Sequence, residues 1–201
     1  MAIMRSEVKT GSSGGDWLGI KKGTIASFKD QSADFDWADV YLAIEFNVEG
    51  SDYTRLLKIA GSFDREPDGR IKDCTLLKRI TYFLDAIGEM GGVNTEGNWE
   101  QESGEPITDI CSHLSKYIGT TLTVYVFKEL AKNGQAYTRI HNKVLPYSST
   151  SEEELQGYIN FLKSKGFIKE ADPNHVNPQQ PVQQNGTGNV PDLGGLDIAN
   201  L

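Results

Sequence analysis

Apolar and polar residues alternate most clearly over residues 37–49. One face of this segment is apolar throughout and carries Val40, Leu42, Ile44, Phe46 and Val48. A period of two is that of a β-strand with one buried face. A tight turn at residues 50–52 and a second apolar run over residues 53–62 predict that the two segments form a β-hairpin.

Two further regions also predict strands. Residues 17–30 have strand character and form the first strand of the prediction. Residues 120–130 and 136–146 flank the dipeptide Asn133-Gly134. Because both of its residues tolerate positive φ, this dipeptide predicts a second, tight hairpin.

Helical spacing replaces alternation in three places. The first helix follows Asp73 as its N-cap, ends at Gly88, and has an apolar face of Leu76, Leu77, Ile80, Phe83, Leu84 and Ile87. Residues 106–118 predict a short helix. A last helix starts at Ser151, where Glu154 completes a capping box, and ends at Gly166. Residues 89–105 lack any period, so we expect a long, solvated loop there.

The order of elements is three strands, two helices, two strands and a helix. Five antiparallel strands with helices between strands 3 and 4 are the order of an oligonucleotide/oligosaccharide-binding barrel, the OB fold. We therefore expect a mainly β fold of the α+β class: a five-stranded antiparallel OB-fold barrel with a C-terminal helix. A β-sandwich and an open α+β sheet are the alternatives.

Composition divides the 201 residues into three parts. Residues 1–16 are rich in Gly and Ser, which predicts a flexible arm. Residues 17–171 have the size and apolar content of one domain. Residues 172–201 contain no Lys or Arg and begin with a Pro/Gln/Asn-rich stretch, which predicts a disordered linker and an acidic, apolar tail.

Charge is segregated along this acidic chain, whose formal net charge is −8. Residues 85–109 carry seven acids and no base, whereas residues 116–143 carry five bases against Glu129 alone. Cys74 and Cys111 are too few for a disulfide framework and are expected to be reduced. Because the chain shows neither a signal-peptide pattern nor an apolar run long enough for a membrane, we expect a cytoplasmic protein.

The second hairpin brings aromatic and cationic residues onto one face. If Leu122, Val124 and Val126 point inward, the other face carries Tyr125, Phe127, Tyr137, Arg139, His141 and Lys143, with Lys128 beside it. Exposed aromatic rings stack on bases, and Lys and Arg bind phosphates, so this pattern favours a single-stranded nucleic-acid site. The alternative is that the rings belong to the core and the cations merely flank them.

A second basic cluster lies at residues 55–79, beside the turn of the first hairpin. Tyr53 and Arg55 alternate as Tyr137 and Arg139 do, and Lys58 follows on the same predicted strand. The second and third strands of an OB barrel are where its ligands bind. Tyr53, Arg55 and Lys58 are therefore also candidates for nucleic-acid binding, and a solvated surface is the alternative.

Three segments together resemble a known group of proteins. They are IGTTLTVYVFK (residues 118–128), the turn Asn133-Gly134 and YTRIHNKVLP (residues 137–146). This part of the chain resembles the closing hairpin of bacteriophage single-stranded DNA-binding proteins. The resemblance implies sequence-independent binding of single-stranded DNA during phage replication or recombination, without catalysis.

The resemblance also implies an acidic C-terminal tail that recruits replication or recombination proteins. The candidate partner-binding residues are Asp192, Leu193, Leu196, Asp197, Ile198 and Leu201. A tail of this kind either binds a partner or competes with DNA for the protein's own cationic face. It departs from the family pattern, since its last ten residues hold two Asp and it ends in Leu where an aromatic residue is usual.

Signatures of enzymes and of metal sites are missing from the sequence. There is no phosphate-binding loop, dinucleotide fingerprint or nucleophile elbow, and Cys111-x-His113 lacks the second ligand pair of a zinc site. We therefore expect no catalysis, cofactor or metal. A homo-oligomer is compatible with the sequence. The main alternative function is a non-enzymatic phage protein-interaction or assembly protein, such as a virion or scaffold component. A third is a small hydrolase or nuclease that uses the acids of residues 85–109.

Overall fold

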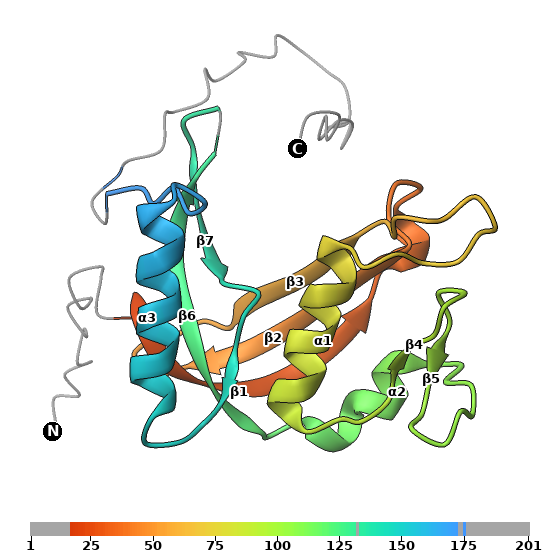
Figure 1. The fold of residues 1–201 in the computed structure, drawn as a ribbon. Coiled ribbons are helices and arrows are strands. Elements are labelled where there is room, and N and C mark those ends of the chain that lie inside the picture. The colour runs from red at the N-terminus through yellow and green to blue at the C-terminus, as the bar shows by residue number, and fades with distance from the viewer. Residues whose placement is uncertain (1–16, 132, 173–174, 176–201) are drawn as a thin grey trace, which may run out of the picture.

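The computed structural model describes residues 17–131, 133–172 and 175 (Figure 1). The strands are β1 (Gly19–Asp30), β2 (Val40–Val48), β3 (Arg55–Gly61), β4 (Gly92–Val93), β5 (Trp99–Glu100), β6 (Thr121–Leu130), β7 (Ala136–Ile140) and β8 (Leu145–Pro146). The helices are α1 (Thr75–Ile87), α2 (Ile110–Leu114) and α3 (Ser151–Ser164), with 3-10 turns at Ser32–Asp34 and Ser115–Tyr117. The predicted α+β class is confirmed.

The main sheet has the strand order β3-β2-β1-β6-β7, and β8 also pairs with β6. Every ladder in it is antiparallel. Both predicted hairpins are present, because β2 pairs with β3 and β6 pairs with β7. Gly134 adopts a φ of +78°, the positive value that the tight turn requires.

β1 is the long strand that joins the two halves of the sheet. It pairs with β2 along one edge and with β6 along the other, and its register with β2 shifts between Ile25 and Ser27. Such a bulge bends a strand and increases its twist. The side chains of Val124 and Phe46 pack closely over Gly23, since a Cβ at this position would stand 3.0 Å from Val124 and 3.1 Å from Phe46. The sheet therefore curls around a core that includes Phe46 and Val124.

The expected closed barrel is wrong, because the sheet stays open between β3 and β7. These two strands are neighbours, but no ladder joins them within the described residues. The chain leaves β7 after only five residues. The backbone N–H of Lys143 donates to Nδ1 of His141 at 3.0 Å, and the chain then returns to β6 as β8. β7 therefore ends at Ile140, before this turn.

α1 covers the inner face of the curled sheet and α3 covers the outside of β6. The side chains that α1 buries include Leu76, Ile80, Phe83, Leu84 and Ile87, as its helical spacing predicts. The predicted N-terminal caps are wrong. Cys74 precedes α1 while Asp73 pairs with Lys78 at 3.0 Å.

The predicted capping box of α3 is also absent. Thr150 precedes α3 without a side-chain cap, and Ser151 donates to the carbonyl of Pro146. The Ser151 hydroxyl therefore fixes the approach to the helix instead of capping it.

Residues 89–105 are more ordered than the expected loop. They contain the short β4–β5 hairpin, and the Asn94 side chain accepts hydrogen bonds from the backbone N–H groups of Glu96 and Asn98. The chain lacks an apolar period here because local turns, rather than a buried face, hold the segment.

Candidate nucleic-acid interface

The face predicted on β6 and β7 exists, but α3 covers its aromatic part. The ladder sets Phe127 opposite Arg139 and Glu129 opposite Tyr137, so these side chains share one face. Tyr125 and Phe127 are only 5% and 8% exposed. Their rings stack with centroids 5.5 Å apart, and they pack in one cluster with Leu155 and Ile159 of α3. The expectation that Tyr125 and Phe127 are exposed for base stacking is therefore wrong.

The hydroxyl of Tyr125 also forms a hydrogen bond within this interface. It donates a hydrogen bond to Glu170, whose carboxylate pairs with Lys163 at 2.9 Å. Burial and the hydrogen bond to Glu170 raise the pKa of Tyr125 to about 12. The side chain thus ties β6 to the segment that follows α3.

His141 and Lys143 belong to the same packed region. His141 lies between Phe127 and Tyr158, and burial lowers its pKa to about 4. The Lys143 ammonium lies 4.6 Å from the ring centroid of Tyr158 and 5.6 Å from that of Tyr82 on α1. Lys143 therefore connects α3 with α1, and His141 packs between β6 and α3. Both side chains serve the packing of the helices and do not form an open binding surface.

Three of the predicted residues on this hairpin remain nearer the solvent. Arg139 is exposed and pairs with Glu129 at 2.7 Å, and Tyr137 is exposed beside the hairpin turn. Lys128 is half-buried and lies opposite Thr138, so its side chain is on the face away from Phe127. Of the predicted rings on β6 and β7, only that of Tyr137 is open for stacking.

The second predicted cluster divides between the two faces of the sheet. Tyr53 is 75% exposed in the turn between β2 and β3. Arg55 lies opposite Phe46 on the inner face, where its guanidinium carbon is 4.1 Å from the ring centroid of Trp17 and burial lowers its pKa. Lys58 points to the outer face and is exposed.

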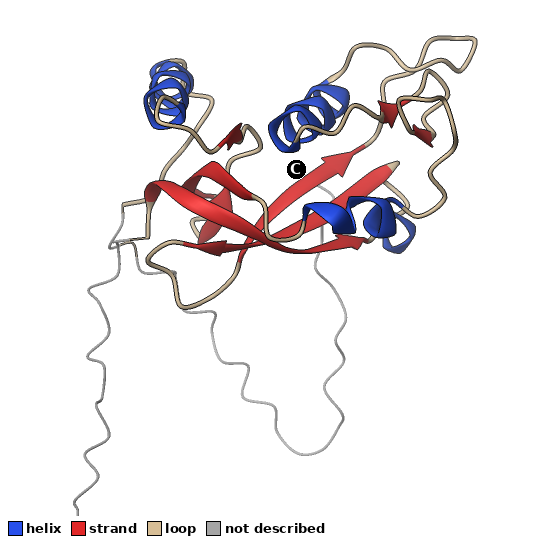
Figure 2. Cartoon of the chain, turned by 90° about the horizontal axis from the view of Figure 1, so that it is seen from below, coloured by secondary structure: helices blue, strands red, loops and turns tan. Residues whose placement is uncertain are grey.

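The outer face of β1, β2 and β3 carries a row of two lysines around an alanine. The register aligns Lys29 with Ala43 and Ala43 with Lys58. Both lysines are exposed, and neither forms an ion pair with a residue that the structure describes. The exposed side chains of Glu45 and Asn47 lie on this same face, and α1 packs on the opposite, inner face, above the sheet in Figure 2.

An aromatic cluster adjoins the lysine row. The loop before β2 stacks Phe35 on Tyr41, with ring centroids 4.5 Å apart, and sets Trp37 edge-on to Tyr41 at 6.1 Å. Trp37 is 46% exposed. The Lys58 ammonium lies 5.8 Å from the Tyr41 centroid, which joins the cluster to the lysine row.

Sequence reasoning missed this cluster of Phe35, Trp37 and Tyr41. Tyr41 alternates onto the polar face of β2, and two aromatic residues stand close before the strand. Three aromatic residues at the entry to one strand are the signal that was available. Of the predicted site residues that the structure describes, Lys58 lies against the cluster.

Acidic side chains surround this surface and limit its positive charge. Asp34 and Asp36 are exposed in the same loop. Asp39 is occupied, because it accepts the backbone N–H of Phe63 at 2.7 Å and lies 3.7 Å from Arg65. Glu45 accepts a hydrogen bond from Ser27 at 2.9 Å. These carboxylates offset the positive charge of Lys29 and Lys58.

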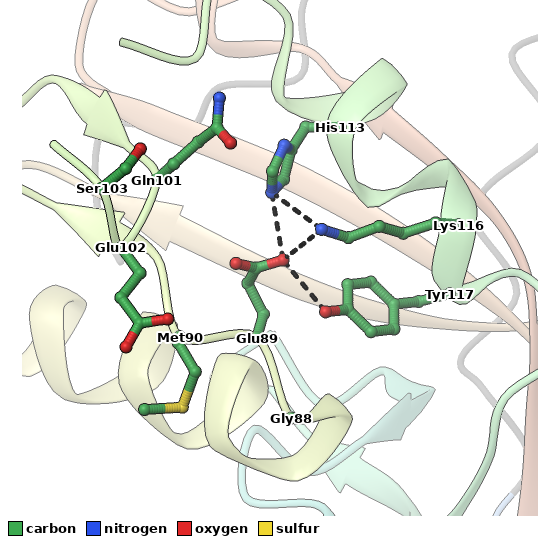
Figure 3. Close-up of a pocket in the computed structure, with 9 residues that line it drawn as sticks. All are labelled: Gly88, Glu89, Met90, Gln101, Glu102, Ser103, His113, Lys116 and Tyr117. Carbon is green, nitrogen blue, oxygen red and sulfur yellow. Dashed lines mark hydrogen bonds and ion pairs between the residues drawn. The ribbon is translucent and has the colours of Figure 1, made fainter. Parts of the chain in front are cut away.

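A separate polar pocket of about 380 Å³ lies between the end of α1 and α2 (Figure 3). Its centre is Glu89, whose carboxylate is 3.0 Å from His113, 2.8 Å from Lys116 and 3.0 Å from the Tyr117 hydroxyl. Burial alone raises the pKa of the Glu89 carboxyl. Hydrogen bonds from Lys116, the Gly91 amide, Tyr117 and His113 outweigh that effect and lower the pKa to about 2.

Glu89 therefore holds a stable negative charge. Its contacts link the segment after α1 to α2 and to the 3-10 turn at Ser115–Tyr117. The expectation of a solvated acidic loop is wrong for this residue, since only 9% of its side chain is exposed. His113 is directed to Glu89, and burial raises the pKa of the Cys111 thiol. Among the residues that the structure describes, no group of three or more His, Cys, Asp or Glu is placed to hold a metal ion.

Comparison of the chain with protein-family models, with curated proteins and with solved structures gave no match. None of the helices within the described ranges is long and apolar enough to cross a membrane. The predicted arm, residues 1–16, lies outside the described residues. So do the predicted partner-binding residues Asp192, Leu193, Leu196, Asp197, Ile198 and Leu201.

Proposed function

We propose that this protein binds single-stranded DNA without sequence preference on the outer face of β2 and β3. The observation that carries the proposal is the aromatic cluster of Phe35, Trp37 and Tyr41, with Trp37 exposed and the other two rings half-buried, beside the lysine row of Lys29 and Lys58. Aromatic rings stack on any base, and lysines follow the phosphates, which is the chemistry of sequence-independent single-strand binding.

The arrangement of the strands supports the choice of this face. We propose that the sheet is an OB fold whose seam between β3 and β7 is open. Its order β3-β2-β1-β6-β7, with α1 between β3 and β6, is that of an OB barrel before closure. Oligonucleotides bind such folds on strands 2 and 3 and on the loops between strands 1 and 2 and strands 4 and 5.

Aromatic rings lie at three of these positions, and those of Trp37 and Tyr137 are exposed while that of Tyr41 is half-buried. The loop between β1 and β2 contributes Trp37, the strand β2 contributes Tyr41, and the β6–β7 hairpin contributes Tyr137. Each base stacked on an aromatic ring contributes about 1–3 kcal/mol. These rings, with Lys58 beside Tyr41, form the proposed path of the strand.

The test is the affinity of two variants for a fluorescently labelled oligo-dT, measured by anisotropy. Trp37→Ala removes the most exposed ring of the cluster, and we expect affinity to fall by about five-fold or more, as the loss of one stacked base implies. Lys58→Ala removes one phosphate contact, and we expect both a weaker affinity and a smaller dependence on salt.

Matched controls replace similar side chains elsewhere. Tyr147→Ala removes a ring that is also 46% exposed but lies before α3. Lys78→Ala removes an exposed lysine of α1 that pairs with Asp73. Both controls are expected to bind as the wild type does. Equal losses in all four variants would contradict the assignment of this face.

The biological setting of the proposal depends on the family resemblance of the β6–β7 hairpin alone. We propose a role in phage DNA replication or recombination, in the host cytoplasm, with the tail from Asp192 to Leu201 recruiting other proteins of these processes. An assembly or interaction protein remains the alternative. It predicts that oligo-dT does not bind at any salt concentration.

A further inference from the structure

The end of α3 carries a second cluster of exposed aromatic and cationic residues. Phe161 and Phe167 are 53% and 73% exposed. Lys165 and Lys169 are exposed as well, and the Lys165 ammonium lies 5.9 Å from the centroid of the Phe161 ring. These four residues are called the α3-end patch below.

The turn after α3 brings Phe167 back to the end of the helix, near Phe161 and Lys165. The backbone N–H of Phe167 donates to the carbonyl of Leu162 at 3.0 Å, and that of Lys165 donates to Phe161 at 3.2 Å. Gly166 adopts a φ of +71°, which a side chain would make unfavourable. The chain thus folds back so that Phe167 returns to the last helical turn.

Packing does not explain why Phe167 is exposed. Its neighbour Ile168 packs against the cluster of Tyr125, Phe127, Leu155 and Ile159 under α3. Phe167 has no part in that cluster. An apolar ring that remains this exposed beside cations is a signal of binding rather than of folding.

Ion pairs within the fold do not explain the positions of Lys165 and Lys169 either. Lys163, in the last turn of α3, pairs with Glu170 at 2.9 Å. Lys165 and Lys169 lie beyond the last residue of the helix, and neither pairs with an acid among the residues that the structure describes. The acids of α3, Glu152, Glu153 and Glu154, lie in its first turn, at the opposite end.

The patch adjoins the proposed DNA path through β6. The backbone N–H of Leu130 donates to the carbonyl of Lys169 at 3.0 Å, and that of Ala171 donates to Lys128 at 2.8 Å. The segment after Phe167 therefore lies along the end of β6, next to the hairpin that carries Tyr137. A strand that leaves the β2–β3 face over this hairpin meets the patch next.

We propose that the α3-end patch is a second contact for the same single strand, so that long strands use it and short ones do not. The proposal depends on the single-strand binding proposed above. Phe161 and Phe167 would stack on bases, and Lys165 and Lys169 would bind the phosphates between them.

The test compares two lengths of labelled oligo-dT. One OB fold covers about 4–16 nucleotides, so an oligonucleotide of about eight nucleotides occupies the β2–β3 face alone and one of about twenty-five also reaches the patch. In the variant Lys165→Ala/Phe167→Ala, we expect affinity for the long strand to fall by about five-fold or more, with affinity for the short strand unchanged. Tyr147→Ala, at the other end of α3, is the matched control and leaves both affinities unchanged.

Each other outcome overturns the proposal in a distinguishable way. If the wild type binds both lengths and the double variant binds them equally well, the patch is not a DNA contact and the β2–β3 site stands. If the wild type binds neither length, the proposed function fails, and the second contact fails with it. If a labelled polyglutamate peptide binds the wild type but not the double variant, while DNA binding is unchanged, the patch is a site for an acidic protein segment.

Discussion

His141 is a residue whose ionisation is coupled to folding. Burial lowers its pKa from 6.5 to about 4, and its Nδ1 accepts the backbone N–H of Lys143 at 3.0 Å. Protonation at Nδ1 would remove this acceptor, which lies at the turn that ends β7. The unfolded chain therefore binds a proton at a pH where the folded protein does not.

We expect the free energy of unfolding to fall as the pH is lowered from about 6.5 to about 4. A depressed pKa contributes stability that is fully present above the unfolded value and is lost as the pH approaches the folded one. One proton gives a slope of at most about 1.4 kcal/mol per pH unit. In His141→Phe this part of the slope should disappear in urea denaturation series. An identical slope in variant and wild type would contradict the assignment to His141.

Glu89 acts in a lower pH range and can be separated from His141. Its pKa is about 2 in the folded protein, below the ordinary value of 4.5. Its contribution is present above pH 4.5 and is lost as the pH falls toward 2. Glu89 therefore remains charged throughout the pH range in which His141 titrates.

At the scale of elements, α3 decides which face of the second hairpin is available. Its Leu155 and Ile159 are fully buried against Tyr125 and Phe127. These contacts turn an aromatic face that suits base stacking into part of the core. None of the described helices covers Lys58 and Trp37 in this way, and both side chains are exposed.

The packing of α3 gives a sharp prediction for Tyr125. Tyr125→Phe keeps the ring and removes the hydroxyl that donates to Glu170. A hydrogen bond to a charged group contributes about 1.5–3 kcal/mol, so we expect that loss in the free energy of unfolding, with the affinity for oligo-dT unchanged. Urea denaturation and anisotropy on the same samples measure both quantities. A lower affinity of Tyr125→Phe for oligo-dT, with an unchanged free energy of unfolding, would show that Tyr125 belongs to the binding surface.

The alternation in β2 and the spacing in α1 identified their buried faces because side-chain period follows backbone geometry. The same reasoning aligned Phe127 with Arg139. It did not reveal which face α3 covers, because Leu155 and Ile159 fit a helix against either side. Nor did it find Trp37, whose contact with Tyr41 depends on the fold of a loop.

The end of β7 could not be predicted from the sequence either. The residues 136–146 alternate as one strand, but the structure divides them into β7 and β8 at the turn of His141 and Lys143. A hydrogen bond between a side chain and the backbone two residues on produces this division. Periodicity does not report such bonds, so a closed barrel was expected where the sheet is open.

At the scale of the whole molecule, the distribution of charge matters more than its sum. The chain has a net charge of −8, and two of its acid-rich segments, residues 85–109 and the first turn of α3, lie outside the proposed DNA face, which has its own acids in Asp34, Asp36 and Glu45. The proposed DNA face holds Lys29 and Lys58, and the α3-end patch adds Lys165 and Lys169. An acidic protein with few cations at its site should bind with a shallow dependence on salt.

The measurement that tests the central claim most directly is the anisotropy of labelled oligo-dT titrated with the full chain at several salt concentrations, with a duplex of equal length as the comparison. We expect the single strand to bind and the duplex to bind much less, because only unpaired bases expose their faces to Trp37, Tyr41 and Tyr137. For a short strand that contacts Lys29 and Lys58, the logarithm of the affinity should fall with that of salt at a slope of about −1.4. Equal binding of duplex and single strand, or no binding at the lowest salt, would contradict the account.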